Sequence, residues 1–483
     1  MISKAENMRK RIEALAAISD QLDMSESEFS SFFRSSEAYS KEFVRDTYEG
    51  KAYRETDNKG LGLRSLEFPL EGKRDPNELL QHYREFVERV GLNPASGGHL
   101  AYIPGGGVPV SAFGDYIAAL TNRYSGVFFA NPGAVRMENL LIDWMSEQLG
   151  FGQCYGNLAS GGSIANLIAV TSARDAQEVE AERIREAVVY LTEQAHHSVQ
   201  KALRIAGLGP AVLRYIPLDD HYRMDVAAFR SQVVADVAAG LKPFLLVSAI
   251  GTTDTGAIDP IAALDEVCKE HSIWHHIDGA YGGFFLMLPE FKELRKAMSC
   301  IDSFTVDPHK GLFLPYGLGA VLVRDKEKLG QSHYYLANYM QDTEGVKDEE
   351  SPAEFSPELT KHYRGLRMWM PLMYYGTDPF RAGLQEKLWL CQYFYEKVQE
   401  LGFEVGPHPE LSVCIYRYVP KEGDANAFNL KLTESVRIDG RVFLSSTTIN
   451  GVVWMRLAVL SFRSKLSTID QCLEVLQELT EGY

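Results

Sequence analysis

From about residue 100 onward, the sequence alternates short β-rich runs with segments of helical spacing, and this alternation constrains the fold more than any other feature. Five runs have the apolar, β-branched composition of buried strands: 187–192, 244–250, 273–277, 303–306 and 319–323. Segments with helical spacing lie between them, at 198–206, 225–238 and 260–269. Because parallel strands need such crossovers, the pattern predicts an α/β fold with a mostly parallel central sheet. Ligands then belong at the carboxyl ends of the strands.

The chain on either side of this region has a different rhythm. In the first part, Asp75 as N-cap, Pro76 in the first turn and Gly91 at the end signal a helix, whose apolar face needs a partner such as another subunit. The last part combines a helix near 380–401 with alternating, strand-like runs. We therefore predict an N-terminal helical dimerisation segment (1–98), a large α/β domain (99–365) and a small C-terminal α+β domain (366–483).

Composition excludes several classes of protein. The 483 residues include 49 Lys+Arg and 65 Asp+Glu, a net charge of −16, so a nucleic-acid partner is not expected. No run approaches the about 18 apolar residues of a membrane span, and the first residues lack the apolar core of a signal peptide. The six cysteines are scattered without a CxxC pair, which favours reduced thiols over disulfides or a zinc site. We expect a soluble, cytoplasmic protein without a metal or membrane partner.

Two motifs at the expected strand ends suit an anion and a flat ring. Ser160-Gly161-Gly162-Ser163 leads directly into a helix, whose free N–H groups favour a phosphate, although a plain tight turn explains the same glycines. In Ala195-His196-His197-Ser198, a histidine follows a strand and has the flat ring needed to stack on a planar cofactor. A helix cap is the simpler explanation for that histidine. Neither motif decides the function alone.

A carboxylate and a lysine complete the pattern. Asp278 ends a strand and precedes Gly279 and Ala280, which leave room for a ring close to the backbone. Lys310 follows Pro-His at the end of the next strand, where burial disfavours the ammonium form and prepares the amine for a Schiff base. Pyridoxal phosphate needs such a lysine, a carboxylate at the pyridine nitrogen, a phosphate cradle and a stacking surface. The four motifs together therefore predict pyridoxal 5'-phosphate as the cofactor.

These motifs resemble those of the group II pyridoxal-phosphate-dependent amino-acid decarboxylases, which include the aromatic-amino-acid, tyrosine, histidine and glutamate decarboxylases. The matching segments are 156–166, 193–196, 251–256, 276–278 and 307–310. The resemblance implies a fold type I enzyme and a tight homodimer with active sites at the subunit interface. It also implies decarboxylation of a small-molecule L-amino acid to the amine and CO2.

The resemblance assigns roles to single residues. Lys310 becomes the Schiff-base lysine, Asp278 the partner of the pyridine nitrogen, and His196 the residue that stacks on the ring. The other implied cofactor contacts are Gly162, Ser163 and His309 at the phosphate and Thr253 and Ala280 at the ring.

Two departures from the family pattern concern the outcome of the reaction. Many members have a tryptophan after the Schiff-base lysine, whereas Gly311 follows Lys310 here, which favours a wider pocket. The aromatic-amino-acid branch also has a tyrosine, assigned the proton to Cα, in a mobile loop after a Gln-Asp pair. No tyrosine lies between Asp342 and Phe355 in this chain.

Three interpretations of the missing tyrosine stay open. The proton comes from another donor such as His196, from a tyrosine at a shifted position (Tyr339 or Tyr363), or the outcome of the reaction is altered. In related enzymes with phenylalanine at the loop position, O2 is consumed and the product is an aldehyde. Phe355 keeps that outcome open.

The substrate side chain is the least constrained feature. Tyr102 and Pro104 lie where the aromatic-amino-acid branch has its side-chain pocket, and with Phe128 they favour an aromatic substrate, although core packing explains such residues equally well. The expected function is decarboxylation of an aromatic L-amino acid. Aldehyde-forming oxidative decarboxylation and an aminotransferase-type reaction are the alternatives. A catalytically silent protein is disfavoured, because a silent site has no need to retain Lys310.

Overall fold

The computed structural model of the chain describes residues 3–48, 50–56, 59–66, 72–334 and 348–482. The chain divides into two compact units, Met1–Asn93 and Pro94–Tyr483. The second unit contains both segments predicted at 99–365 and 366–483, each with a sheet of its own. The three-part division stays a prediction.

The first unit is mainly helical. It contains α1 (Lys4–Ser19), α2 (Glu26–Asp46), α3 (Pro76–Tyr83) and the antiparallel pair β1 (Tyr53–Arg54) and β2 (Gly91–Leu92). The N-cap predicted at Asp75 is confirmed, because its side chain accepts the backbone N–H of Asn77. The helix predicted to reach Gly91 continues after Tyr83 as a π-helical turn.

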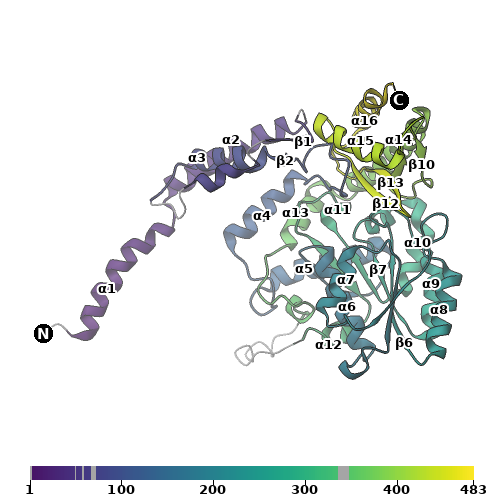
Figure 1. The fold of residues 1–483 in the computed structure, drawn as a ribbon. Helices are drawn as coiled ribbons and strands as arrows, with labels where there is room; N and C mark the ends of the chain where they lie inside the picture. The colour runs from purple at the N-terminus through teal and green to yellow at the C-terminus, as the bar shows by residue number, and fades with distance from the viewer. Residues whose placement is uncertain (1–2, 49, 57–58, 67–71, 335–347, 483) are drawn as a thin grey trace. The chain divides into compact units, whose positions relative to one another are not determined.

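A mixed sheet of seven strands, in the order β3-β9-β8-β7-β6-β4-β5, forms the centre of the second unit (Figure 1). Its strands are β3 (Tyr155–Ala159), β4 (Ala187–Leu191), β5 (Val212–Tyr215), β6 (Lys242–Ala249), β7 (Trp274–Asp278), β8 (Ser303–Val306) and β9 (Gly319–Val323). From β5 to β8 the pairing is parallel, whereas β9 runs antiparallel to both its neighbours. The predicted mostly parallel α/β sheet is confirmed.

All five predicted strands form, with ends shifted by at most two residues. Strands β3 and β5 are not among those predicted. Gly156 and Asn157 give β3 a low strand propensity. β5 is a four-residue strand at the edge of the sheet, so it lacks the long apolar run of a central strand.

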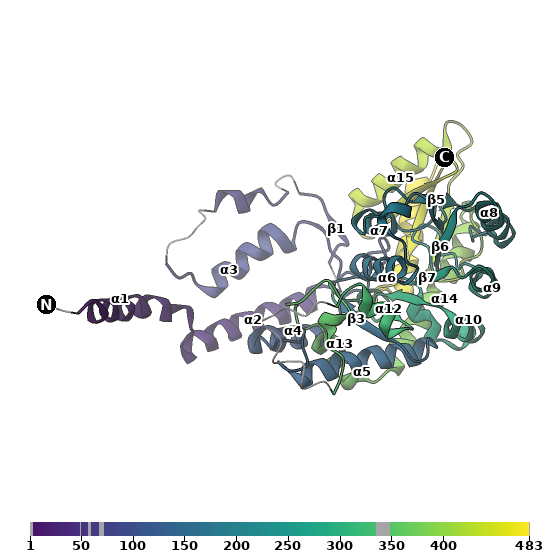
Figure 2. The ribbon, with the colours of Figure 1, turned by 90° about the horizontal axis from the view of Figure 1, so that it is seen from below.

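Helices cover both faces of this sheet, with α6 and α7 on one side and α8 and α9 on the other (Figures 1 and 2). The helices of the second unit are α4 (Pro109–Thr121), α5 (Pro132–Leu149), α6 (Gly162–Ala176), α7 (His197–Ile205), α8 (Val226–Ala238), α9 (Ile261–His271), α10 (Lys292–Ala297), α11 (Pro308–Gly311), α12 (Lys326–Gln331), α13 (Gly365–Tyr375), α14 (Asp378–Glu400), α15 (Ala425–Asp439) and α16 (Leu466–Thr480). Along β4, Val189 packs in the cluster formed with α6 and α7, whereas the next residue, Tyr190, packs with Phe229 of α8. This alternation is typical of a strand buried on both faces.

The C-terminal part of the second unit has an antiparallel sheet in the order β10-β11-β13-β12. Its strands are β10 (Glu404–Val405), β11 (Val413–Arg417), β12 (Ser445–Ile449) and β13 (Val452–Ala458). Phe394 of α14, Val436 of α15 and Leu476 of α16 share a hydrophobic cluster with this sheet, which confirms the predicted α+β arrangement. No helix in the described part of the chain has the length and hydrophobicity of a membrane span.

Candidate active site

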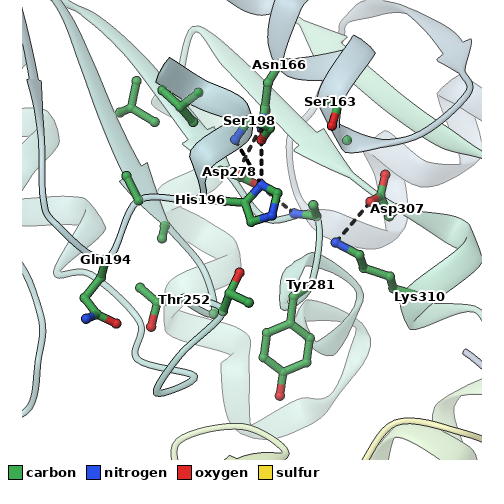
Figure 3. A pocket seen from close by; sticks show the side chains of 18 of the residues that line it. Ser163, Asn166, Gln194, His196, Ser198, Thr252, Asp278, Tyr281, Asp307 and Lys310 are labelled. Atoms are coloured by element: carbon green, nitrogen blue, oxygen red, sulfur yellow. Dashed lines mark hydrogen bonds and ion pairs between the residues drawn. The ribbon is translucent and has the colours of Figure 1, made fainter. Parts of the chain in front are cut away.

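A pocket of about 250 Å³ lies at the carboxyl ends of the parallel strands (Figure 3). Its wall is formed by the loops that follow β3, β4, β6, β7 and β8. All of the residues predicted to bind the cofactor line it: Gly162, Ser163, His196, Thr253, Asp278, Ala280, His309 and Lys310. They meet because the carboxyl ends of parallel strands share one edge of the sheet.

The turn between β3 and α6 forms a cradle for an anion. Gly161 has a φ of 149°, a conformation that favours glycine, and precedes the first turn of α6. A Cβ on Gly162 would lie 3.0 Å from Asp307 Oδ2 and 3.1 Å from Ala280 Cβ, so a larger residue would push these neighbours away and the close approach of the backbone favours glycine. The N–H groups of Gly162 and Ser163 belong to the first turn of the helix, where they have no helical acceptor and suit a phosphate.

Two charged side chains from neighbouring strands face the pocket. Asp278, the last residue of β7, accepts the Ala280 N–H on Oδ1 at 3.1 Å and Asn166 Nδ2 on Oδ2 at 2.9 Å. Lys310 lies in the short helix after β8, with its Nζ 3.3 Å from Oδ2 of the buried Asp307. The pocket thus holds a carboxylate and a primary amine, which suit a pyridine nitrogen and an aldehyde respectively.

Two histidines on the wall are held in fixed orientations. His196 caps α7, with its Nδ1 accepting the backbone N–H of Ser198 at 3.3 Å. His309 donates from Nδ1 to the carbonyl oxygen of Leu318 at 2.6 Å. Burial lowers the pKa of both rings, although a nearby carboxylate partly opposes this. Both rings are therefore neutral near pH 7.

The wall also contains a polar atom without a protein partner. Gln194 Oε1 is buried and accepts no hydrogen bond from the described residues. Such an atom is costly in a folded protein unless a water molecule or a ligand donates a hydrogen bond to it. With the glycine cradle, Asp278, Lys310 and His196 on the same wall, the residues fit pyridoxal phosphate. No group of three His, Cys, Asp or Glu side chains among the described residues is placed to hold a metal ion.

Comparison with known protein families leads to the same cofactor. Residues 77–419 match the pyridoxal-dependent decarboxylase conserved domain. The chain belongs to this family. The predictions of pyridoxal phosphate as cofactor and of amino-acid decarboxylation as the reaction are confirmed.

The decarboxylase is similar to known relatives over most of its length. It is 31% identical over 418 residues to the aromatic-L-amino-acid decarboxylase of Bacillus atrophaeus, covering 85% of this chain and 86% of the relative. It is 28% identical to the phenylacetaldehyde synthase of Petunia hybrida, covering 74% and 76%. The solved structure of Oryza sativa TDC with PLP and tryptamine matches it with a TM-score of 0.89 and 24% identity, covering 95% and 98%. The structural likeness confirms fold type I.

The three residues predicted to bind the substrate, Tyr102, Pro104 and Phe128, are not on this wall. Phe128 is only 3% exposed, and the guanidinium group of Arg136 lies over its ring at 5.2 Å from the centroid. The ring of Tyr102 is exposed, and its centroid lies 5.7 Å from that of Phe443. Because aromatic rings pack in cores and surfaces as well as in pockets, the sequence pattern does not separate these cases.

The segment that lacks a tyrosine is only partly described. Tyr339 and the Gln-Asp pair of this chain, Gln341 and Asp342, lie outside the described residues. Phe355 is buried, with its ring centroid 6.1 Å from that of Tyr155. Tyr363 is also buried, and its hydroxyl lies 2.8 Å from Met137 Sδ. Neither Phe355 nor Tyr363 lines the pocket of this chain.

Several wall residues have no role assigned by the sequence analysis: Asn166, Gln194, Ser198, Thr252, Tyr281 and Asp307. Asn166 and Asp307 lie inside motifs that match the family. The sequence therefore places them near the site but does not show what they bind. Tyr281 follows Asp278 by three residues, and its hydroxyl lies 2.8 Å from Ser412 Oγ. Burial raises the pKa of Tyr281, so its hydroxyl stays protonated near pH 7.

Proposed function

We propose that this decarboxylase acts on an aromatic L-amino acid and releases the corresponding amine and CO2. The observation that carries the proposal is that Lys310, Asp278, His196 and the N–H groups of Gly162 and Ser163 face one pocket. The name of the Bacillus atrophaeus relative supports an aromatic substrate. The described wall carries no arginine and no lysine besides Lys310, so it offers no partner for an acidic side chain.

The charged residues have separate tasks in this reaction. When bound, pyridoxal phosphate supplies a sink for the electron pair released as the bond between Cα and the carboxylate breaks. We assign Lys310 to hold the cofactor through its aldehyde carbon. The negative charge of Asp278 keeps a proton on the ring nitrogen, because an opposite charge at close range favours the protonated form.

The remaining wall residues orient the cofactor. We assign His196 to lie against one face of the ring, and His309 with the N–H groups of Gly162 and Ser163 to bind the phosphate. Thr253 and Ala280 are assigned to contacts with the ring. Contacts at the ring nitrogen, the ring face and the phosphate hold the cofactor in one orientation. This orientation determines which substrate bond can be aligned for cleavage.

Oxidative decarboxylation and an aminotransferase-type reaction would need different side chains in the pocket wall. Oxidative decarboxylation to an aldehyde is the second candidate, because the described part of the segment after Asp342 brings no tyrosine to the pocket. One relative is named as a phenylacetaldehyde synthase. An aminotransferase-type reaction needs a firm clamp for the substrate carboxylate, and the described wall has no arginine for it.

Product analysis distinguishes these reactions. The holoenzyme is incubated with tyrosine, tryptophan, phenylalanine, L-DOPA, histidine and glutamate, and CO2, amine, aldehyde and O2 are followed together. We expect one amine per CO2 from an aromatic amino acid, without O2 uptake. Aldehyde with O2 uptake would instead support the second candidate. Turnover of glutamate alone would contradict the aromatic substrate.

We also propose that the enzyme is a cytoplasmic homodimer with active sites at the interface, and that residues 1–98 pack on the partner. Large apolar side chains support this, because α4 and α13 contact each other and expose Phe113, Leu120, Met373 and Tyr374 to solvent. Sedimentation should give a particle of twice the 54.1 kDa chain mass. Met373→Asp should shift the particle mass toward that of the monomer. A wild-type protein that sediments as a monomer would contradict the proposal.

A further inference from the structure

A chain of buried hydrogen bonds runs from the interior of the sheet toward the pocket. Trp274 Nε1 lies 2.8 Å from Ser303 Oγ, and Ser303 Oγ lies 2.9 Å from His276 Nδ1. His276 Nε2 lies 3.1 Å from Asn166 Oδ1. None of these four side chains is more than 1% exposed, so they depend on one another for their hydrogen bonds.

The chain of hydrogen bonds branches at Asn166, next to the pocket (Figure 3). Asn166 Nδ2 lies 2.9 Å from Asp278 Oδ2 and 3.1 Å from Ser198 Oγ. Ser198 Oγ in turn lies 2.7 Å from His196 Nδ1. One amide group therefore connects the two residues that the proposed function assigns to the ring nitrogen and the ring face.

The residues at the two ends of this hydrogen-bond chain determine which group donates and which accepts in every bond between them. The indole of Trp274 can only donate a hydrogen bond, and the carboxylate of Asp278 can only accept one. Asn166 must therefore turn its NH2 group to Asp278 and its carbonyl to His276, which carries its proton on Nε2. Ser303 then donates to the bare Nδ1 of His276. Burial lowers the pKa of His276 to about 4, in agreement with a single proton on this ring.

The same argument fixes the proton of His196. The second N–H of Asn166 is donated to Ser198 Oγ, and because the backbone N–H of Ser198 is already donated to His196 Nδ1, the Ser198 hydroxyl is the donor in its own bond to that nitrogen. The backbone N–H of Ser198 is donated to the same nitrogen at 3.3 Å. A ring nitrogen that accepts these bonds carries no proton, so the neutral ring carries it on Nε2. His196 lines the pocket, and Nε2 is the nitrogen that its cap leaves free.

We propose that Asn166 is a positioning residue, which fixes the proton of His196 on Nε2 and thereby presents an N–H donor to the occupant of the pocket. The same amide holds Asp278 as a hydrogen-bond acceptor. The inference rests on the proposed function only for the identity of the occupant, because the position of the proton follows from the hydrogen bonds alone. An N–H donor at this point suits an oxygen of the substrate, such as one of its carboxylate.

Asn166→Asp tests the inference with a side chain of the same shape. The new carboxyl group lies 2.9 Å from Asp278 Oδ2, so the two groups share one proton. Its oxygen accepts the Ser198 hydroxyl proton, so Ser198 no longer donates to His196, and only the backbone N–H of Ser198 remains on Nδ1. ¹⁵N NMR of the full-length holoenzyme, labelled at its histidine nitrogens, distinguishes protonated from bare ring nitrogens. The His196 signals are assigned by their loss in His196→Gln. We expect a protonated Nε2 in the wild type and a mixture of both neutral ring forms in Asn166→Asp.

A wild-type proton on Nδ1, or an unchanged spectrum in Asn166→Asp, would overturn the inference. Asn429→Asp is the matched control, since Asn429 is a buried asparagine away from the pocket that bonds to backbone groups of Tyr418. It should lower stability and leave the His196 signals unchanged.

Ser198→Ala gives a second test if Asn166→Asp does not fold. Only the backbone N–H then remains on His196 Nδ1, so we expect a mixture of both ring forms, and a spectrum identical to the wild type would contradict the inference. The outcome is separable from that of the proposed function. If the wild-type enzyme forms no amine but its His196 carries the proton on Nε2, the proposed function is contradicted and the role of Asn166 is not.

Discussion

Lys310→Ala is expected to abolish decarboxylation and the visible absorption of the bound cofactor. Lys310 is the primary amine on the described pocket wall, so the variant has no group to hold the cofactor aldehyde. A lysine in contact with the reacting centre is also a candidate for general acid–base catalysis, and loss of such a group typically costs about 10²–10⁴-fold in rate. We therefore expect kcat to fall by at least that factor. The absorption spectrum and CO2 release are measured on the same sample.

Lys387→Ala is the matched control for loss of a buried lysine. Lys387 lies in α14, where it bonds to Glu386, and it is away from the pocket. Its removal should lower the melting temperature and leave the absorption band in place. If Lys310→Ala retained the band while Lys387→Ala lost it, the assignment of Lys310 would be wrong.

Asp278→Asn is expected to lower kcat by about 10²–10³-fold, the typical cost of removing one electrostatic group from a preorganised site. The variant keeps the shape of the side chain and removes the negative charge that we propose holds a proton on the ring nitrogen. One oxygen remains to accept a hydrogen bond from Asn166 or from the Ala280 N–H, so the fold of the loop should persist. Cofactor affinity and kcat are measured separately, by titration of the apoenzyme and by amine release.

Asp302→Asn provides the comparison for this variant. Asp302 is a carboxylate near the sheet that accepts the backbone N–H of His275, and burial raises its pKa. It does not line the pocket. We expect kcat near the wild-type value in Asp302→Asn. Equal losses in the two variants would show that Asp278 acts through stability rather than charge.

The sequence predicts the sheet well because each central strand is an apolar run between turn residues. β8 and β9 are predicted to the residue, since both are buried on two faces and bounded by polar or glycine positions. The pocket residues are predicted for a related reason. Asp278 ends a central strand, and Lys310 and His309 follow another, so the carboxyl ends of parallel strands bring them to one place. Gly162 and Ser163 instead follow the edge strand β3, and the glycine motif itself predicts them.

The connections between these residues are not visible in the sequence. Asn166 bonds to Asp278 across 112 positions and to His276 across 110, and no local pattern encodes such a pairing. The strand β3 is not predicted, because it forms through pairing with β9 and its residues have a low strand propensity of their own. The contact between Arg136 and the ring of Phe128 is likewise absent from any local sequence pattern, and the role of Phe128 in substrate binding stays a prediction.

The most direct test of the central claim is to locate the cofactor on the chain. The purified holoenzyme is reduced with borohydride, digested and analysed by mass spectrometry, so that the lysine bound to the cofactor carries its mass. The arrangement of the pocket predicts that this mass lies on Lys310, and that adding a substrate amino acid before reduction lowers the labelled fraction. Labelling of a different lysine, or none, would contradict the account.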